Sequence, residues 1–243
     1  MSDMAKSGER DRCVTGIDGL DNILGGGIPR SNIVLVAGAC GTGKTTLAFE
    51  FLVRGSLMGE SGLLISTVES QDKLVSNIPH FIFFNDKMLV KGQVAIMELE
   101  HLLESANLSP SKMDEAAVKK LVSAIGKTVA ASKVKRLVID SIDTILGEIK
   151  DEALNALLLS DLSIILYKNE CTALLVTSEE TCKTIEGRVA DGIIMMGNHE
   201  RRGDLLRTMQ VIKMKATSHS RSKYVIDLTP AGVLVTPILK GGS

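Results

Sequence analysis

Aromatic residues are scarce in this sequence, and tryptophan is absent. Aromatic residues make up 3% of the 243 positions, so rings for stacking single-stranded bases are poorly supplied. No apolar run reaches the roughly 18 residues of a membrane-spanning helix, and residues 1–6 are polar where a signal peptide would be apolar. The four cysteines, Cys13, Cys40, Cys171 and Cys182, form no C-x-x-C pair, which favours reduced thiols over disulfides or zinc. We therefore expect a cytoplasmic protein that does not enter a membrane.

The sequence also lacks an overall excess of charge of either sign. Its formal net charge is −1, so no general attraction draws the chain to nucleic acid. The charge is nevertheless uneven, because residues 200–224 carry seven basic and two acidic side chains, a net charge of +5, and the remainder is −6. Two interpretations are open: a solvated pair of strands, or a surface that contacts the phosphates of a neighbouring subunit's nucleotide or of nucleic acid.

The length and the apolar content suit one large α/β domain. The chain has a mass of 26.0 kDa and is 44% hydrophobic, which is enough for a sizeable core. We expect this domain to occupy residues 13–243. Residues 1–12 are highly charged, and we expect them to be disordered or loosely attached.

One segment, G-A-C-G-T-G-K-T at residues 38–45, fits the phosphate-binding pattern G-x-x-x-x-G-K-[ST] of a P-loop. Glycines let the backbone wrap around phosphate oxygens and point N–H groups at them. The apolar run 33–37 before the loop is typical of a buried parallel strand, and residues 46–53 after it are typical of a helix. The N-terminus of that helix would face the phosphates. This context argues against a chance match and predicts that the chain binds a nucleoside triphosphate.

The residue types in this loop predict separate roles for its members. Lys44 would reach the β- and γ-phosphates, and the hydroxyl of Thr45 would bind Mg²⁺. We therefore expect a nucleoside triphosphate together with Mg²⁺ in this loop. The predicted nucleotide-binding residues are Gly38, Ala39, Cys40, Gly41, Thr42, Gly43, Lys44, Thr45 and Thr46.

The rest of the chain alternates strand-like runs with helical patterns. Residues 114–131 carry an apolar helical stripe, and a second long helix is expected near 152–168. This alternation indicates a largely parallel sheet with helices on both faces. After residue 190 strands follow one another without helices, which predicts an antiparallel C-terminal extension. The expected strands are 33–37, 62–67, 134–141, 171–178, 192–196, 206–214 and 224–228, with weaker candidates at 93–97 and 232–237.

Two acidic residues come directly after predicted strands. Asp140 closes an apolar strand, where P-loop proteins hold Mg²⁺ with a carboxylate, and we predict that role for it. Glu69 follows the strand next after the P-loop helix, where a carboxylate can orient the water that attacks the γ-phosphate. A surface glutamate at a strand end is an equally good interpretation of Glu69 from its chemistry alone.

Several motifs together resemble the KaiC family of RecA-like ATPases, which are related to the archaeal recombinase RadA. They are T-G-I-D-G-L-D-N-I-L-G-G-G-I-P at residues 15–29, the P-loop, T-V-E-S at 67–70, L-V-I-D-S at 137–141, and the late runs V-A-D-G-I-I and K-M-K-A-T-S-H. The similarity spans residues 13–238, with the motifs in the order of the family. It implies a RecA-like P-loop fold, ATP or ADP with Mg²⁺ as the bound cofactors, and an oligomeric ATPase, as a hexameric ring or a filament.

The resemblance also implies roles for particular residues. Glu69 matches the first of two consecutive glutamates of the family, the candidate base, but Ser70 stands where the second would be, so the rate of hydrolysis is in doubt. Lys213, Lys215 and His219 match a late signature whose groups reach across a subunit interface toward the γ-phosphate of the adjacent protomer. Their charge would stabilise the transferred phosphoryl group, as an arginine finger does. Lys215 replaces the more common arginine and offers a point charge instead of a fork.

Two specialised activities of relatives are not expected. Autophosphorylation in two-domain members uses a Ser-Thr pair four and three residues before an aspartate that Asp191 matches, and here those positions are Gly187 and Arg188. Recombinases hold single-stranded DNA with basic loops after two of the strands. The corresponding segments, 146–152 and 179–186, are net acidic and would repel a phosphate backbone.

The sequence therefore predicts an ATP-binding, slowly hydrolysing, Mg²⁺-dependent protein that acts as an oligomeric ATPase or nucleotide-dependent regulator. One alternative is a RadA-paralogue-like protein that binds single-stranded DNA through residues 201–207. A further alternative is an ATP-gated interaction switch without turnover.

Overall fold

The computed structural model describes residues 11–77, 82, 84, 87–109, 113–181, 183–201 and 203–238. Most of the segment expected to be loosely attached lies outside these residues. Arg12, however, forms strand β1 (Arg12–Cys13) against β2 (Ile28–Pro29). Its guanidinium donates hydrogen bonds to the carbonyls of Leu24 and Gly27 and to the hydroxyl of Thr217. The attached part of the chain thus includes at least one residue before Cys13.

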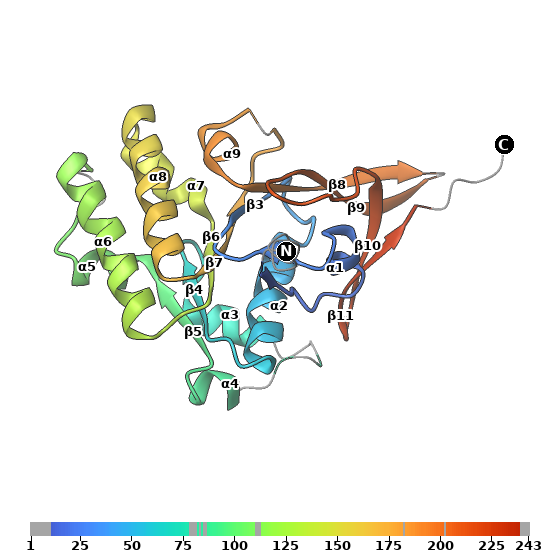
Figure 1. The fold of residues 1–243 in the computed structure, drawn as a ribbon, viewed down its shortest axis with the longest axis horizontal. Coiled ribbons are helices and arrows are strands. Elements are labelled where there is room, and N and C mark those ends of the chain that lie inside the picture. Colours follow the sequence, from blue (N-terminus) through green and yellow to red (C-terminus); the bar gives the residue numbers. More distant parts are fainter. Residues whose placement is uncertain are drawn as a thin grey trace, which may run out of the picture.

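A nine-stranded sheet forms the centre of the described chain, in the order β11-β10-β9-β8-β3-β7-β6-β4-β5 (Figure 1). The strands from β8 to β5 in this order are parallel to one another. The P-loop strand β3 lies inside the sheet, between β7 and β8. The bounds of the parallel strands are β3 Ile33–Ala37, β4 Gly62–Ser66, β5 Val94–Glu98, β6 Arg136–Asp140, β7 Thr172–Thr177 and β8 Gly192–Arg201.

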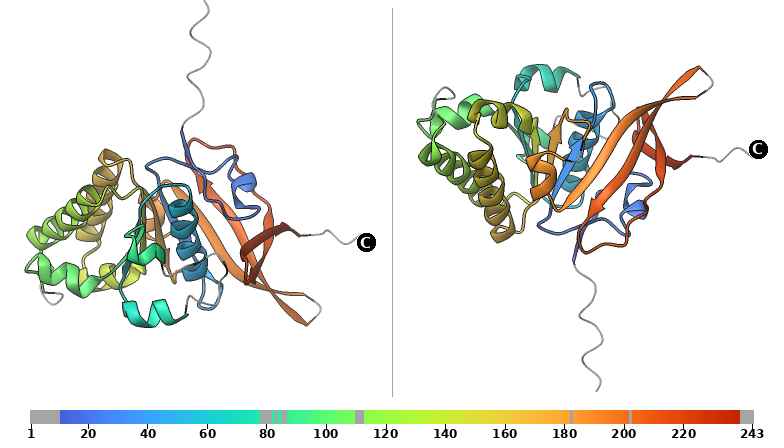
Figure 2. Two further views of the ribbon diagram at one scale, coloured as in Figure 1. Left: turned by 90° about the horizontal axis from the view of Figure 1, so that it is seen from below. Right: turned by 90° about the horizontal axis from the view of Figure 1, so that it is seen from above.

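The C-terminal strands continue the sheet with antiparallel pairing. These strands are β9 (Asp204–Met214), β10 (Lys223–Thr229) and β11 (Gly232–Pro237). The long β8–β9 pair projects beyond the rest of the molecule (Figure 2). The predicted fold class, a mostly parallel α/β sheet with an antiparallel C-terminal extension, is confirmed.

Helices cover both faces of the sheet because successive strand side chains point to opposite sides. In β3, Val34 and Val36 join a core cluster with α1, α2, α3 and α4, whereas Ile33 and Leu35 join a second cluster with α5, α6, α7 and α8. The helices are α1 Leu20–Ile23, α2 Lys44–Leu57, α3 Gln71–Asn77, α4 Lys87–Val90, α5 Leu99–Ser105, α6 Glu115–Ala131, α7 Ile142–Ile149, α8 Glu152–Lys168 and α9 Ile185–Val189. None of the described helices is both long and apolar enough to cross a bilayer.

The two long helices begin at aspartate caps and pack closely together. The carboxylate of Asp114 accepts a hydrogen bond from the backbone of Ala117 at 2.9 Å, and that of Asp151 accepts one from Ala153 at 2.8 Å, which satisfies free N–H groups of the first turn. Helix α6 approaches α8 at Gly126, where a Cβ would lie 2.7 Å from Cγ2 of Ile165. A larger residue at this position would push the helices apart.

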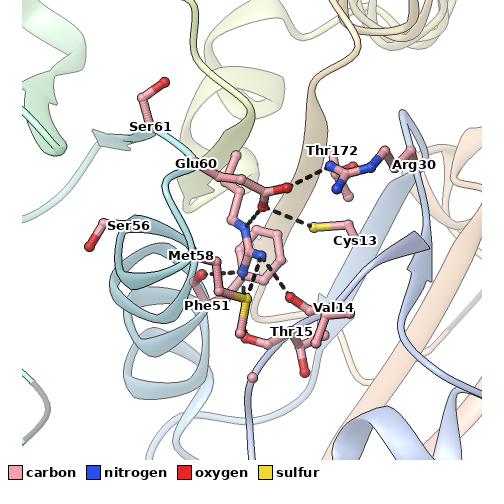
Figure 3. Close-up of polar contacts among 12 residues, drawn as sticks. Cys13, Val14, Thr15, Arg30, Phe51, Ser56, Met58, Glu60, Ser61 and Thr172 are labelled. Atoms are coloured by element: carbon pink, nitrogen blue, oxygen red, sulfur yellow. Dashed lines mark hydrogen bonds and ion pairs between the residues drawn. The ribbon is translucent and has the colours of Figure 1, made fainter. Parts of the chain in front are cut away.

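A buried arginine joins β6, α2 and the segment after β1 at the amino edge of the sheet. Figure 3 shows three of the residues that it contacts, Val14, Phe51 and Glu60. Arg136, the first residue of β6, is 0% exposed. It donates to Glu60 at 2.6 Å, to the carbonyl of Val14 at 2.6 Å and to that of Phe51 at 2.8 Å, and stacks on the Phe51 ring. Glu60 also pairs with Arg30 at 2.7 Å. Burial alone would raise the pKa of Glu60, but the hydrogen bonds from Arg30 and Arg136 hold it below its usual value.

Candidate functional site

A cleft of about 620 Å³ lies where the parallel strands end. Ligands of open α/β sheets bind at this carboxyl edge. The P-loop between β3 and α2 forms one side of the cleft, and the segments that follow β4 and β6 form the other. Of the predicted nucleotide-binding residues, six line the cleft: Cys40, Gly41, Gly43, Lys44, Thr45 and Thr46.

The backbone of the P-loop requires glycine at two points in particular. Gly38 has a φ of 144°, and a Cβ there would lie 1.9 Å from the carbonyl oxygen of Met196 on β8. Gly43 has a φ of 96° and precedes the first residue of α2. These conformations are strained for other residues and bring the loop tightly round to the helix N-terminus, where N–H groups favour an anion. The hydroxyl of Thr42 closes the loop by donating to the carbonyl of Ala39 at 2.9 Å.

Two cations lie on the P-loop. The ammonium of Lys44 donates to the carbonyls of Gly38 at 2.6 Å and Ala39 at 2.8 Å. From β9, Nε of Arg207 donates to the carbonyl of Gly41 at 3.2 Å. Arg207, a member of the basic segment 200–224, therefore contacts the P-loop of its own chain. The sequence analysis did not predict this contact. The pairing of β9 with β8, the strand next to β3, is what brings it there.

Thr45 and Asp140 meet in the cleft, although 95 positions separate them. Both side chains line the cleft, and hydrogen bonding by the Thr45 hydroxyl lowers the pKa of the Asp140 carboxyl. Burial raises the pKa of Asp140, and the nearby carboxylates of Glu69 and Asp143 raise it further, while Thr45 and Lys44 act in the opposite direction. The net result is a half-buried carboxylate with too little positive charge around it, which a cation would stabilise.

These residues fit a magnesium ion that arrives with a nucleotide. The described residues contain no group of three or more His, Cys, Asp or Glu that could hold a metal by itself. Mg²⁺ does not need such a group, because it keeps several waters and commonly takes one or two protein ligands together with phosphate oxygens. A hydroxyl and a half-buried carboxylate beside a P-loop meet that requirement.

Glu69 lies at the side of the cleft opposite the P-loop. It follows β4, lines the cleft and is 36% exposed at its side chain, where it pairs with Lys73 at 3.3 Å. The hydroxyl of Ser66 donates to the backbone carbonyl of Glu69 at 2.5 Å and fixes the loop. The structure thus brings Glu69 to the same cleft as Lys44, Thr45 and Asp140.

Asp143 is a cleft residue that the sequence analysis missed. It lies in the first turn of α7 and accepts hydrogen bonds from the hydroxyl of Thr177 at 2.5 Å and from the backbone of Ser178 at 2.7 Å. These contacts tie α7 to the end of β7. A signal was present, because Asp143 comes three residues after Asp140 in a helix that opens onto the same edge.

Comparison with known proteins matches this site to a family. The sequence profile described as "ATPase: KaiC" matches residues 13–240. The chain belongs to the KaiC ATPase family. It is 32% identical to a UPF0273 protein of Thermotoga maritima, over 93% of this chain and 96% of that one. It is 28% identical to the circadian clock protein KaiC2 of Synechocystis, over 98% of this chain but 42% of that protein.

A solved structure supports the same assignment. The KaiC-like protein PH0186 of Pyrococcus horikoshii superposes with a TM-score of 0.79 and 30% sequence identity, over 94% of this chain and 100% of that one. The fold is therefore that of a KaiC-like, RecA-type domain, and family membership supports ATP binding in the cleft.

Ser70, where KaiC-family members have a second glutamate, serves a structural purpose in this chain. Its hydroxyl accepts a hydrogen bond from the backbone N–H of Lys73 at 3.4 Å, and its carbonyl accepts one from Leu74 at 3.0 Å. These are contacts of a helix N-terminus, and serine is a favoured residue there. Ser70 therefore starts α3 and leaves Glu69 as the carboxylate of this loop in the cleft.

The three late basic residues of the KaiC signature lie away from the P-loop of their own chain. Lys213 pairs with Ile193 near the start of β8, and its ammonium donates to the carbonyl of Ala190 at 2.6 Å. Lys215 pairs with Asp191 at 2.8 Å. His219 makes its contact with the carbonyl of Ser220. Burial and the charge of Lys215 lower the pKa of Lys213. None of the three is a cleft residue of the described chain.

The segments compared with recombinase DNA loops are partly helical. Residues 146–149 form the last turn of α7, and Asp151 caps α8, so 146–152 is not the free loop that we expected. In 179–186, Thr184 caps α9 by accepting from the backbone of Gly187 at 3.3 Å, and Glu186 is buried. Capping by short polar side chains explains the difference, because it lets the helices start close to the strand ends.

Proposed function

We propose that this KaiC-family chain is a Mg²⁺-dependent ATPase of low turnover that acts as an oligomeric ATPase or nucleotide-dependent regulator. The observation that carries the proposal is that Thr45 and Asp140 come together in the cleft beside the P-loop, where Thr45 and Lys44 oppose the rise in the pKa of Asp140. A structural ion pair or a solvated carboxylate would not need this arrangement, whereas a nucleotide with its metal would.

The residues of the cleft divide into binding and activating groups. The P-loop backbone and Lys44 would hold the phosphates, with Lys44 exchanging the carbonyls of Gly38 and Ala39 for phosphate oxygens. Thr45 and Asp140 would hold the magnesium ion, which when bound neutralises phosphate charge. Arg207 contacts the loop from outside and would steady it.

Glu69 would orient the attacking water by accepting its proton. Two features of the structure slow this step. The carboxylate is paired with Lys73 at 3.3 Å, so it must loosen that pair to accept a proton. The position after it is a serine used as a helix cap, so no second carboxylate supports it. Low turnover follows from both.

The late basic residues would complete the site of an adjacent copy. Lys215 is the best placed of them, because its side chain is 56% exposed although it contacts Asp191. Lys213 is half-buried at the C-terminus of α9 and would act by positioning that end of the helix. We therefore expect a head-to-tail assembly, as a ring or a filament, in which the site is incomplete without its neighbour.

Nucleotide turnover by three proteins tests the proposal. Wild type should hydrolyse ATP slowly and only with Mg²⁺, Glu69→Gln should bind ATP with turnover reduced at least about 100-fold, and Lys44→Ala should not bind. Full turnover in Glu69→Gln would contradict the assignment of the base. If wild type binds ATP tightly but turns it over no faster than Lys44→Ala, the result would instead favour an ATP-gated switch without hydrolysis. This switch is the second candidate function, because the ion pair with Lys73 occupies the carboxylate of Glu69.

A further inference from the structure

A second cavity, of about 310 Å³, lies beside the nucleotide cleft at the same edge of the sheet. Its floor is apolar and buried, and is formed by Leu99 and Leu103 of α5, Leu121 of α6 and Ile145 of α7. These four residues belong to the core cluster that packs under α5–α8. The cavity is therefore an opening into the margin of the core.

The rim of this cavity carries charge of one sign. Glu69, Glu98, Glu100 and Glu148 line it, and no lysine, arginine or histidine of the described chain does. The carboxylate of Glu98 is held in place by the backbone N–H of Gln71 at 2.8 Å. Within the part of the chain that the structure describes, Glu69 has Lys73 as an ion-pair partner, whereas Glu100 and Glu148 have none. The rim thus keeps a negative field over an apolar floor.

The cavity shares a wall with the nucleotide cleft. Ser66, Val68 and Glu69 line both, so the loop after β4 separates the two spaces. Val68 is 76% exposed, although its side chain is apolar. A ligand in the cavity would cover Val68 and contact the carboxylate that we assign to water activation.

We call this cavity the acidic pocket, and it is lined by residues 66–70, 98–100, 103, 113, 121, 144, 145 and 148. We propose that it binds a peptide segment of a partner protein in which a leucine-like side chain adjoins lysine or arginine. Its volume is at the small end of ligand sites, which suits one or two anchoring side chains better than a whole cofactor. The apolar floor receives the anchor, and the four carboxylates attract the basic neighbours and exclude acidic segments. Because the occupant touches the Glu69 loop, peptide and nucleotide affect each other's affinity in both directions.

Selection from a displayed library of random twelve-residue peptides tests the pocket without assuming a sequence. We expect enrichment of peptides in which Leu, Met or Phe adjoins Lys or Arg. An enriched peptide, synthesised with a fluorophore, should bind the full chain in a polarisation assay. The double variant Glu100→Gln/Glu148→Gln should weaken binding at least about tenfold. Enrichment no greater than on the empty matrix, or enrichment of acidic peptides, would overturn the proposal.

A matched double variant separates the pocket from a general charge effect. Glu104→Gln/Glu180→Gln changes the net charge by the same amount, and both side chains are exposed and outside the pocket. Its affinity for the peptide should equal that of wild type. Equal losses in the two double variants would show attraction to the whole acidic surface and overturn the specific site.

The link to the nucleotide has its own readout. The same peptide should bind with an affinity at least about threefold different in Mg²⁺ with a non-hydrolysable ATP analogue than in Mg²⁺ with ADP. Equal affinity would overturn the coupling. Failure of the pocket and failure of the proposed function give different results. Peptide binding without ATP turnover would support the pocket and contradict the ATPase assignment. ATP turnover without peptide binding would support the ATPase assignment and contradict the pocket.

Discussion

At the scale of single residues, Asp140 shows how the fold prepares a cation site. Its carboxylate is half-buried near Glu69 and Asp143, and loss of solvent together with these neighbouring charges raises its pKa. A carboxyl whose pKa is raised by folding stabilises the protein below its unfolded pKa, and loses that contribution as the pH rises through the folded value. At neutral pH the ionised carboxylate of Asp140 therefore destabilises the free protein, and a bound divalent cation would offset this destabilisation.

The substitution Asp140→Asn separates metal binding from folding. The amide keeps the volume and can accept the hydrogen bond from Thr45, so we expect a melting temperature equal to or above that of wild type. Mg²⁺-dependent ATP binding should fall at least about tenfold, measured by titration calorimetry. In wild type the same binding should weaken as the pH falls through the raised pKa, because protons compete with the metal. A variant that melts lower than wild type but binds ATP normally would contradict both roles.

Some roles of single residues can be predicted from the sequence and others cannot. The P-loop is a contiguous pattern, and Asp140 comes directly after an apolar strand, so local order points to them. Arg207 and Asp143 are different, because their contacts with Gly41 and Ser178 depend on strand neighbours far apart in the chain. The cap made by Ser70 depends on where α3 begins, which the surrounding residues do not mark clearly.

At the scale of elements, strands were predictable and short helices were not. The run at 33–37 coincides with β3 because a strand buried on both faces leaves a plain apolar signal, and even the weaker candidate at 232–237 coincides with β11. Helix α7, in contrast, has eight residues and contains Gly147, so it gives too few turns for a helical period. Its start is set by tertiary contacts of Asp143 with β7, which no local pattern encodes.

The buried network of Arg136 links β6, α2 and the segment after β1 on the side away from the cleft. Replacing it by Met should lower the free energy of unfolding by about 3–5 kcal/mol, because carbonyls of Val14 and Phe51 and the Glu60 carboxylate lose their donor. Urea denaturation measures the loss. Lys119→Ala, which removes an exposed ion pair with Glu115, is the control and should cost under about 1 kcal/mol. A loss for Arg136→Met as small as that of the control would show that the network contributes little.

At the scale of the whole molecule, two of the late basic residues lie in a different region from the nucleotide cleft. The cleft and the acidic pocket lie at the carboxyl ends of the parallel strands, whereas Lys213 and Lys215 lie beside the start of β8 and the end of α9. In the proposed head-to-tail assembly, Lys213 and Lys215 of one copy would lie near the cleft of the next, and a segment of charge +5 would face the acidic remainder.

Mixing two inactive variants tests whether neighbouring copies share a site. Lys44→Ala lacks the phosphate-binding lysine but can supply Lys215, whereas Lys215→Ala has an intact P-loop but no such cation to offer. In a random equimolar assembly about a quarter of the interfaces would combine an intact P-loop with an intact Lys215, so turnover should recover to about a quarter of the wild-type rate. Lys223→Ala, an exposed lysine of the same basic segment, should be active alone and serves as the control. If both inactive variants assemble normally with ATP and the mixture stays inactive, Lys215 does not act on its neighbour, and its contact with Asp191 is then its whole role.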